Sequence, residues 1–109
     1  MPYSYRLTPL AEADLDETLG YLSGKLDSPA AALNLLHDVI AAMETACLMP
    51  YANPNCEHSF IQDSAYRHVR VRNYILVYRV NEKTGTIEAL RFLYARRDIS
   101  KQDISGRAS

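Results

Sequence analysis

The sequence is poor in the residues on which several common functional motifs depend. Its 109 residues include no tryptophan, four glycines, two cysteines and three histidines. The glycines are scattered, so no glycine-rich loop is present to cradle a phosphate group. Gly-x-Ser-x-Gly and His-Glu-x-x-His motifs are also absent. These absences argue against the nucleotide-binding proteins, serine hydrolases and zinc peptidases that are defined by those motifs.

Cysteine and histidine are also too few and too scattered to indicate a disulfide framework or a metal site. Cys47 falls on the apolar side of an expected helix and Cys56 in a loop, and cysteines of cytosolic proteins are usually free thiols. Cys56 and His58 form one close pair, whereas a structural zinc ion takes four ligands, usually in two such pairs. We therefore expect no disulfide, no metal and no cofactor.

Long hydrophobic runs are missing as well. The longest uncharged stretches, 28–37 and 45–56, are far shorter than the ~20 apolar residues that cross a bilayer. The first residues lack the basic-then-apolar pattern of a signal peptide. We therefore expect a cytoplasmic chain that does not interact with membranes. A length of 109 residues with 48% hydrophobic and 23% charged residues predicts one globular domain, residues 1–109.

The charge distribution is the first positive feature of the sequence. Residues 1–65 carry two basic and nine acidic side chains, a net −7, and residues 66–109 carry ten basic and four acidic, a net +6. The whole-chain value of −1 hides this division. A separation of this size inside one small domain produces a strong local field.

Two helix starts are marked in the acidic half. Thr8-Pro9 and Ser28-Pro29 each place an N-cap residue before a proline at the first helical position. Apolar residues at helical spacing then predict helices to about residue 26 and about residue 49, before Pro50. The short connection between them predicts an antiparallel hairpin. The expected buried stripes are Ala11, Leu15, Leu19, Leu22 and Leu26, and then Ala32, Leu36, Val39, Ile40, Met43 and Cys47.

Strands are expected on both sides of this hairpin. Residues 3–8 form a short β-prone segment, and from residue 65 the apolar period changes to two, which predicts strands 66–72, 74–80 and 86–96. A turn at Asn73, which tolerates a positive φ, and a loop ending at Gly85 would join them into an antiparallel meander. The fold class is therefore α+β, with the hairpin covering one sheet face. The alternation assigns Val69, Val71, Tyr74, Leu76, Tyr78, Val80, Leu90, Phe92 and Tyr94 to the covered face.

Arginines dominate the other face of the predicted sheet. The planar guanidinium suits bidentate contact with phosphate or carboxylate, so this face could bind nucleic acid or an acidic peptide. The alternative is that the arginines only solvate the sheet and pair with Glu88 or with acids of the helices. Ten basic residues against four acids in this half weaken that alternative. The open face would carry His68, Arg70, Arg72, Arg79, Arg91 and Arg97, beside Ile75 and Val77.

The sequence also carries a family resemblance, strongest over residues 66–98. The run Tyr-Arg-His-Val-Arg-Val-Arg-Asn-Tyr-Ile-Leu-Val-Tyr-Arg-Val (66–80), the strand 87–93 and the segment Tyr-Ala-Arg-Arg-Asp (94–98) resemble the RelE/ParE toxins. The opening Tyr-Arg-Leu-Thr-Pro-Leu-Ala-Glu-Ala-Asp-Leu (5–15) is similar to their first strand and helix. The resemblance implies a growth-inhibiting toxin of a plasmid-stabilising toxin–antitoxin system, with a cognate antitoxin encoded by a neighbouring gene.

Two activities are implied by the resemblance. RelE-like toxins cleave mRNA on the ribosome, and ParE-like toxins poison DNA gyrase. For cleavage the candidate catalytic residues are His68, Arg70 and Arg97, although a histidine such as His68 is more often a surface or cross-strand residue than a general base. The candidate target- or nucleic-acid-binding residues are Arg67, Arg70, Arg72, Arg79, Arg91, Tyr94, Arg96 and Arg97.

One position favours the second activity. RelE-like toxins place an arginine directly after the tyrosine of the middle strand, and this chain has Ile75 there. The C-terminal Tyr or His-Tyr of the nucleases is also missing after Asp98, and Tyr94 could replace it only by facing outward. The sequence therefore predicts a ParE-like toxin with gyrase as target. A ribosome-dependent mRNA endonuclease is the first alternative, and a non-toxic binding module that retains the fold is the second.

Overall fold

The structure, a computed structural model, describes residues 3–53 and 66–95. Cys56, Arg96 and Arg97 lie outside these residues. The elements are β1 (Ser4–Leu7), α1 (Pro9–Gly20), a π-helical turn η1 (Tyr21–Lys25), α2 (Pro29–Leu48), β2 (Tyr66–Val71), β3 (Tyr74–Asn81) and β4 (Thr86–Tyr94). This order confirms the predicted strand, helical hairpin and meander, and each strand ends within two residues of its predicted limit.

Both predicted helix starts are confirmed by capping hydrogen bonds. The Thr8 hydroxyl accepts from the Ala11 amide at 3.2 Å, and the Ser28 hydroxyl accepts from the Ala31 amide at 3.3 Å. Such caps stabilise a helix by about 1 kcal/mol each. Both caps join residues three apart in the sequence, so the starts of the two helices can be predicted from local sequence.

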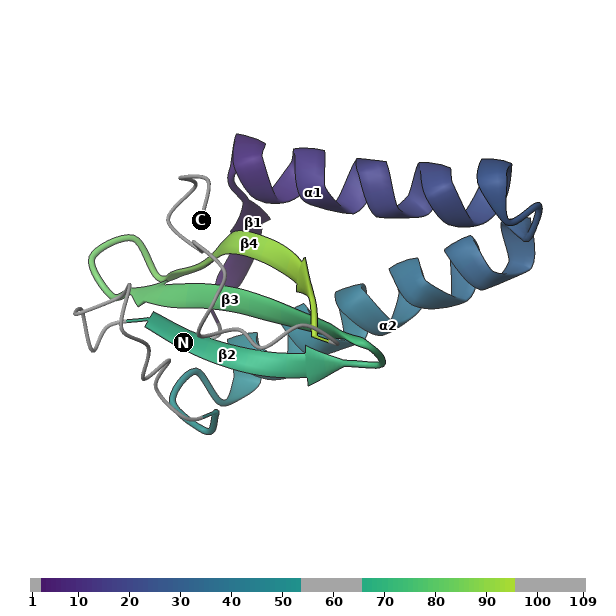
Figure 1. Cartoon of the computed structure of the whole chain (residues 1–109). Helices are drawn as coiled ribbons and strands as arrows, with labels where there is room; N and C mark the ends of the chain where they lie inside the picture. The colour runs from purple at the N-terminus through teal and green to yellow at the C-terminus, as the bar shows by residue number, and fades with distance from the viewer. Residues whose placement is uncertain (1–2, 54–65, 96–109) are drawn as a thin grey trace.

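The connection between the helices is less regular than the sequence predicted. The first helix changes at Tyr21 into the π-helical turn η1, and Asp27 then adopts a left-handed conformation at φ 51°. In Figure 1 the tip of the hairpin projects beyond the end of the sheet. Leu26 therefore has no sheet beneath it, and its 52% exposure contradicts its assignment to the buried stripe.

The four strands form one mixed sheet in the order β1-β4-β3-β2. The meander β2-β3-β4 is antiparallel as expected, whereas β1 pairs in parallel with β4 at the edge. The β2–β3 turn has its left-handed residue at Arg72 (φ 56°) and not at Asn73, where the sequence placed it. Arg72 is therefore a turn residue and does not continue the strand alternation.

The helices cover one face of the sheet and form the main core with it. The first stripe contributes Ala11 and Leu15, as expected, and the second is rotated by one residue: Leu35 and Ala46 are buried, while Ala32, Leu36 and Ile40 are half-buried. Cys47 is a buried free thiol whose pKa is raised by burial and by the nearby Glu44. The buried core of this face comprises Ala11, Leu15, Leu35, Val39, Met43, Ala46, Cys47, Val71, Leu76, Tyr78, Ile87, Ala89 and Phe92.

Helix α2 is long and apolar enough to cross a membrane by length and composition alone, with a mean hydropathy of 1.3. The packing of α2 in the fold accounts for its apolar residues without a membrane. Leu35, Val39 and Met43 are each at most 2% exposed because they pack into the core beneath the sheet. The helix therefore has the form of an amphipathic core helix, and such helices also meet the criterion of length and composition.

A bulge in β4 corrects one assignment of the alternation. Val77 of β3 pairs with Arg91, but the next residue, Tyr78, pairs with Ala89, so Leu90 is the extra residue. An extra residue shifts the faces of all that follows it. Ile87 and Ala89 thus join Phe92 in the core, and Leu90 lies on the opposite, distal face against Val77, which contradicts its predicted position.

Candidate functional site: the distal face of the sheet

The centre of the distal face, which lies opposite the helices, is apolar. Val77 is 1% exposed and packs with Tyr66, Ile75, Leu90 and Leu93. Ile75 pairs across the sheet with Arg70 on one side and Leu93 on the other. The described part of the face is therefore an apolar patch with charged groups around it, and not the arginine field that the alternation suggested.

Arg79 lies at one end of this patch in a cross-strand triad. Glu88 of β4 is 8% exposed and pairs with Arg79 of β3 at 2.6 Å and with Arg6 of β1 at 3.2 Å. The hydrogen bond from Arg79 and a second from Arg6 lower the pKa of Glu88, against an opposing effect of burial. The side chains of Arg79 and Arg6 remain 43% and 56% exposed, so the triad presents a net positive charge to solvent.

The side chain of Arg91 is bound to the helical layer. Its side chain makes two hydrogen bonds to Asp14 of α1, at 2.7 and 3.2 Å, and both side chains are buried to about five-sixths. The same carboxylate accepts from the Phe92 amide at 3.0 Å. Asp14 thus binds β4 beyond the point where β1 ends, and the expectation that Arg91 lies exposed on the open face is not met.

Arg72 and Arg70 lie at the opposite end of the sheet. Arg72 pairs with Asp38 of α2, on the helical side, because its turn conformation directs it away from the distal face. Arg70 is exposed and donates from Nε to the Arg72 carbonyl at 2.9 Å. Of these two arginines, only Arg70 remains on the distal face.

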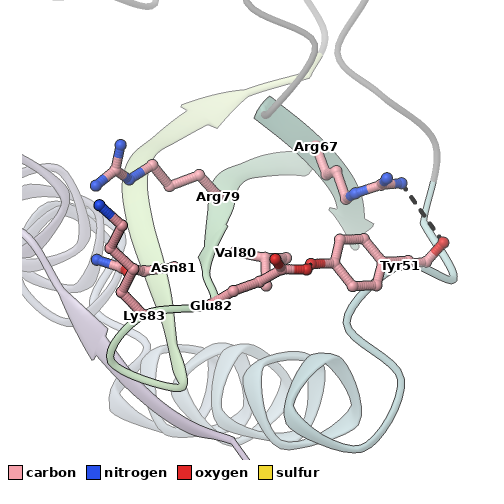
Figure 2. A pocket seen from close by; sticks show the side chains of 7 residues that line it. All are labelled: Tyr51, Arg67, Arg79, Val80, Asn81, Glu82 and Lys83. Atoms are coloured by element: carbon pink, nitrogen blue, oxygen red, sulfur yellow. Dashed lines mark hydrogen bonds between the residues drawn. The ribbon is translucent and has the colours of Figure 1, made fainter.

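Arg67 lies on the helical side as well. Its Nη1 donates to the Asn53 carbonyl at 2.6 Å, and its guanidinium carbon lies 4.9 Å from the centroid of the Tyr51 ring. This cation–π contact joins the segment after α2 to the first residues of β2. Figure 2 shows the arrangement beside a groove at the end of the sheet.

His68 and Tyr94 are placed without an evident catalytic arrangement. His68 pairs across the sheet with Val77, and its Nδ1 is buried with no hydrogen-bond partner in the part of the chain that the structure describes. Tyr94 is 40% exposed, but it lies on the helical side with its ring 5.4 Å from that of Tyr74, which stacks on Phe92. Among residues 3–53 and 66–95, no carboxylate forms an ion pair with His68 that would mark it as a general base.

The distal face therefore offers binding chemistry more clearly than proton-transfer chemistry. Within residues 3–53 and 66–95 no group of three histidine, cysteine or acidic residues could hold a metal ion. Sequence reasoning named Glu88, together with acids of the helices, as a possible partner of the arginines, but it did not single out Asp14 or Arg6. The pairing of Asp14 could not be read from the sequence because it depends on the helix packing.

Comparison with known proteins identifies the family. Among curated proteins none matches the sequence. The fold is similar to a chain of the chromosomal ParDE toxin–antitoxin system from P. aeruginosa, with TM-score 0.66 and 19% identity over 84% of this chain and 95% of that one. It is also similar to a chain of the toxin–antitoxin complex RelBE2 from Mycobacterium tuberculosis, with TM-score 0.59 and 19% identity over 86% and 99%. At such identity these likenesses establish the fold alone.

The sequence itself gives the family assignment. The family described as the ParE toxin of the type II toxin–antitoxin system parDE matches residues 5–99, which include both helices and all four strands. The match confirms the preference for a ParE-like over a RelE-like relationship that Ile75 suggested. The chain belongs to the ParE toxin family of type II toxin–antitoxin systems.

Proposed function

We propose that this chain inhibits growth in the cytoplasm by binding DNA gyrase, and that an antitoxin encoded by a neighbouring gene holds it inactive. Such a pair would stabilise a plasmid that carries it. The observation that carries the choice of target is the apolar centre of the distal face. Cleavage of RNA requires cations for the phosphate charge and a group that moves or positions a proton. Ile75, Val77 and Leu93 occupy the centre where those groups would be needed.

The neighbouring cations support the same choice. Arg91 is bound by Asp14, and Arg79 is held by Glu88, so both are neutralised in part within the fold. An apolar patch bordered by arginines is the composition of a protein-binding surface, where arginine is enriched and charge is depleted at the core. A large protein target fits this surface better than a single scissile phosphate does.

Support for a protein antitoxin comes from the β1 side of the sheet. β1 is an edge strand, and along it runs a groove of about 540 Å³ lined by Tyr3, Ser4, Tyr5, Glu44, Cys47 and Leu48. Leu48 is 76% exposed there. An extended peptide can add to a free strand edge through backbone hydrogen bonds and insert apolar side chains into such a groove.

The target is tested with purified protein in a gyrase supercoiling assay. The chain should inhibit supercoiling and accumulate cleaved DNA–gyrase complexes, and a boiled sample should do neither. Full gyrase activity in excess toxin would reject this target.

The endonuclease alternative keeps one observation in its favour, the exposed Arg70 beside His68 on β2. It predicts cut mRNA on programmed ribosomes and loss of cutting in Arg70→Ala, with Arg97→Ala as the second variant. Intact mRNA excludes it. If expression of the chain alone leaves growth unchanged, both activities are excluded and the non-toxic binding module remains.

A further inference from the structure

A groove at the end of the sheet lies apart from the groove along β1 and meets the rim of the distal patch at Arg79. Its volume is about 590 Å³, and it lies between the segment after α2 and the β3–β4 hairpin (Figure 2). It is lined by Tyr51, Arg67, Arg79, Val80, Asn81, Glu82 and Lys83. Three of these side chains are cationic and one is anionic, so the groove is positive in a chain whose net charge is −1.

Arg67 is held in a fixed position at one wall of the groove. It stacks over the Tyr51 ring, and its Nη1 donates to the carbonyls of Asn53 at 2.6 Å and Tyr51 at 3.4 Å. These hydrogen bonds use Nη1 alone, and no acid of the described residues lies within salt-bridge distance of Arg67. Nε and Nη2 thus keep the paired geometry that a carboxylate accepts.

Among the described residues that line the groove, Glu82 is the one carboxylate, and it is bound by a phenol. The Tyr51 hydroxyl donates to Glu82, and Figure 2 shows the two side chains meeting in the middle of the groove. This hydrogen bond, assisted by the negative charge, raises the pKa of Tyr51 to about 12. Glu82 forms no ion pair with Arg67 or with Lys83 in the described structure, so the positive charge of the groove is only partly offset.

We propose that this groove binds an acidic side chain of a partner peptide. Arg67 and Lys83 bind its carboxylate, and Glu82, which already lies in the groove, competes with it. The inference rests on the proposed function in one respect, namely that the partner is the antitoxin. A peptide carboxylate fits better than a nucleic acid strand. A strand needs a continuous basic track, whereas α1 and α2 carry most of the acids of the −7 half of the chain. A single pocket with two available cations suits one or two carboxylates.

The test measures binding of fluorescein-labelled hexaglutamate to the full chain by fluorescence anisotropy at low salt. Hexaglutamine is the neutral control and an eight-residue oligothymidylate is the nucleic acid arm. Arg67→Gln and Lys83→Gln should each weaken hexaglutamate binding by about tenfold, the range of a charge-assisted hydrogen bond. Glu82→Gln should strengthen it severalfold, because the glutamine still accepts from Tyr51 but no longer repels or competes.

Controls separate the groove from general charge and from folding. Arg70→Gln removes an exposed arginine at the other end of the sheet and should leave binding unchanged. Lys83 lies in an exposed loop, so its variant folds even if Arg67→Gln does not. Equal affinity of wild type, Lys83→Gln and Glu82→Gln overturns the proposal, and so does tighter, Lys83-dependent binding of the oligothymidylate.

The toxin assay distinguishes this inference from the proposed function. Lys83→Gln and Glu82→Gln should inhibit gyrase as the wild type does. If the wild type binds hexaglutamate but does not inhibit gyrase, the proposed target is refuted and the proposal for the groove is unaffected.

Discussion

Glu88 shows how one buried carboxylate organises the cationic rim of the distal face. It lies directly across from Arg6 on one neighbouring strand and from Arg79 on the other. A carboxylate that is 8% exposed is costly to bury without partners, and two charge-assisted hydrogen bonds offset that cost. The two arginines are fixed in return, which lowers the entropy lost when they contact a target.

Replacement of Glu88 by glutamine should destabilise the fold in a pH-dependent way. Since the folded pKa of Glu88 is lowered, its charge stabilises the protein above the ordinary glutamate pKa of about 4.3. That contribution is lost as the pH falls through the lower folded pKa. At pH 7 Glu88→Gln should lose about 1–2 kcal/mol, because both arginines are half-exposed and screened. Urea unfolding from pH 7 to pH 3 measures the difference, which should shrink at the acid end.

Glu17→Gln on the exposed side of α1 serves as the matched control and should follow the wild type across the range. A gap between wild type and Glu88→Gln that stays constant down to pH 3 would contradict the role assigned to the charge.

At the scale of elements, the end of β4 pairs with β3 on one side and is bound by a helix side chain on the other, where β1 has ended. β1 pairs with β4 only as far as Ala89, so the backbone of β4 beyond that residue needs other partners on this side. Asp14 supplies one by accepting from the Phe92 amide while it binds Arg91. The bulge at Leu90 makes this possible, because it increases the local twist where β4 leaves β1.

Asp14→Asn should therefore be among the most destabilising substitutions of partly exposed residues in the chain. The asparagine has the same shape and can still accept from Phe92, but it leaves the guanidinium of Arg91 buried without a counter-charge. Breaking a buried pair in this way costs about 3 kcal/mol. Urea denaturation should show a lower midpoint at an unchanged m-value, whereas the exposed Asp16→Asn should stay within about 0.5 kcal/mol of wild type. Matching midpoints for the two variants would refute this role of Asp14.

The same elements show where sequence reasoning succeeds and where it ends. Helix starts were predictable because Thr8 and Ser28 cap through hydrogen bonds three residues away. The strands were predictable from local alternation. The face of Leu90 was not, since a bulge depends on the register with another strand, and a one-residue shift reverses the side. The distal face was the hardest part to predict, because Arg91 and Arg72 leave it and pair with Asp14 and Asp38, which are both distant in sequence.

At the scale of the whole molecule, part of the opposite charge of the two sequence halves is neutralised by ion pairs between them. Two of the four ion pairs among the described residues join an acid of the helices to an arginine of the sheet, Asp14 to Arg91 and Asp38 to Arg72. Besides these two pairs, Arg6 and Arg79 share the single carboxylate of Glu88, and further cationic side chains lie at Arg67, Arg70 and Lys83. A partner therefore meets separate regions of different character: the apolar distal patch, the cationic groove and the β1 edge.

Separate regions predict that toxicity and neutralisation can be uncoupled by one substitution. Leu48 lies in the groove along β1 and is 76% exposed, so Leu48→Lys should not disturb the fold. If the antitoxin buries this side chain, its loss and the added charge should weaken the complex by about 1.5–3 kcal/mol, roughly tenfold to a hundredfold. Cells expressing Leu48→Lys should stop growing as with wild type, but co-expression of the protein from the neighbouring reading frame should no longer rescue them. Leu33→Lys, at the far end of α2 and 53% exposed, should remain rescued. Rescue of both variants would mean that the antitoxin binds elsewhere than the β1 edge.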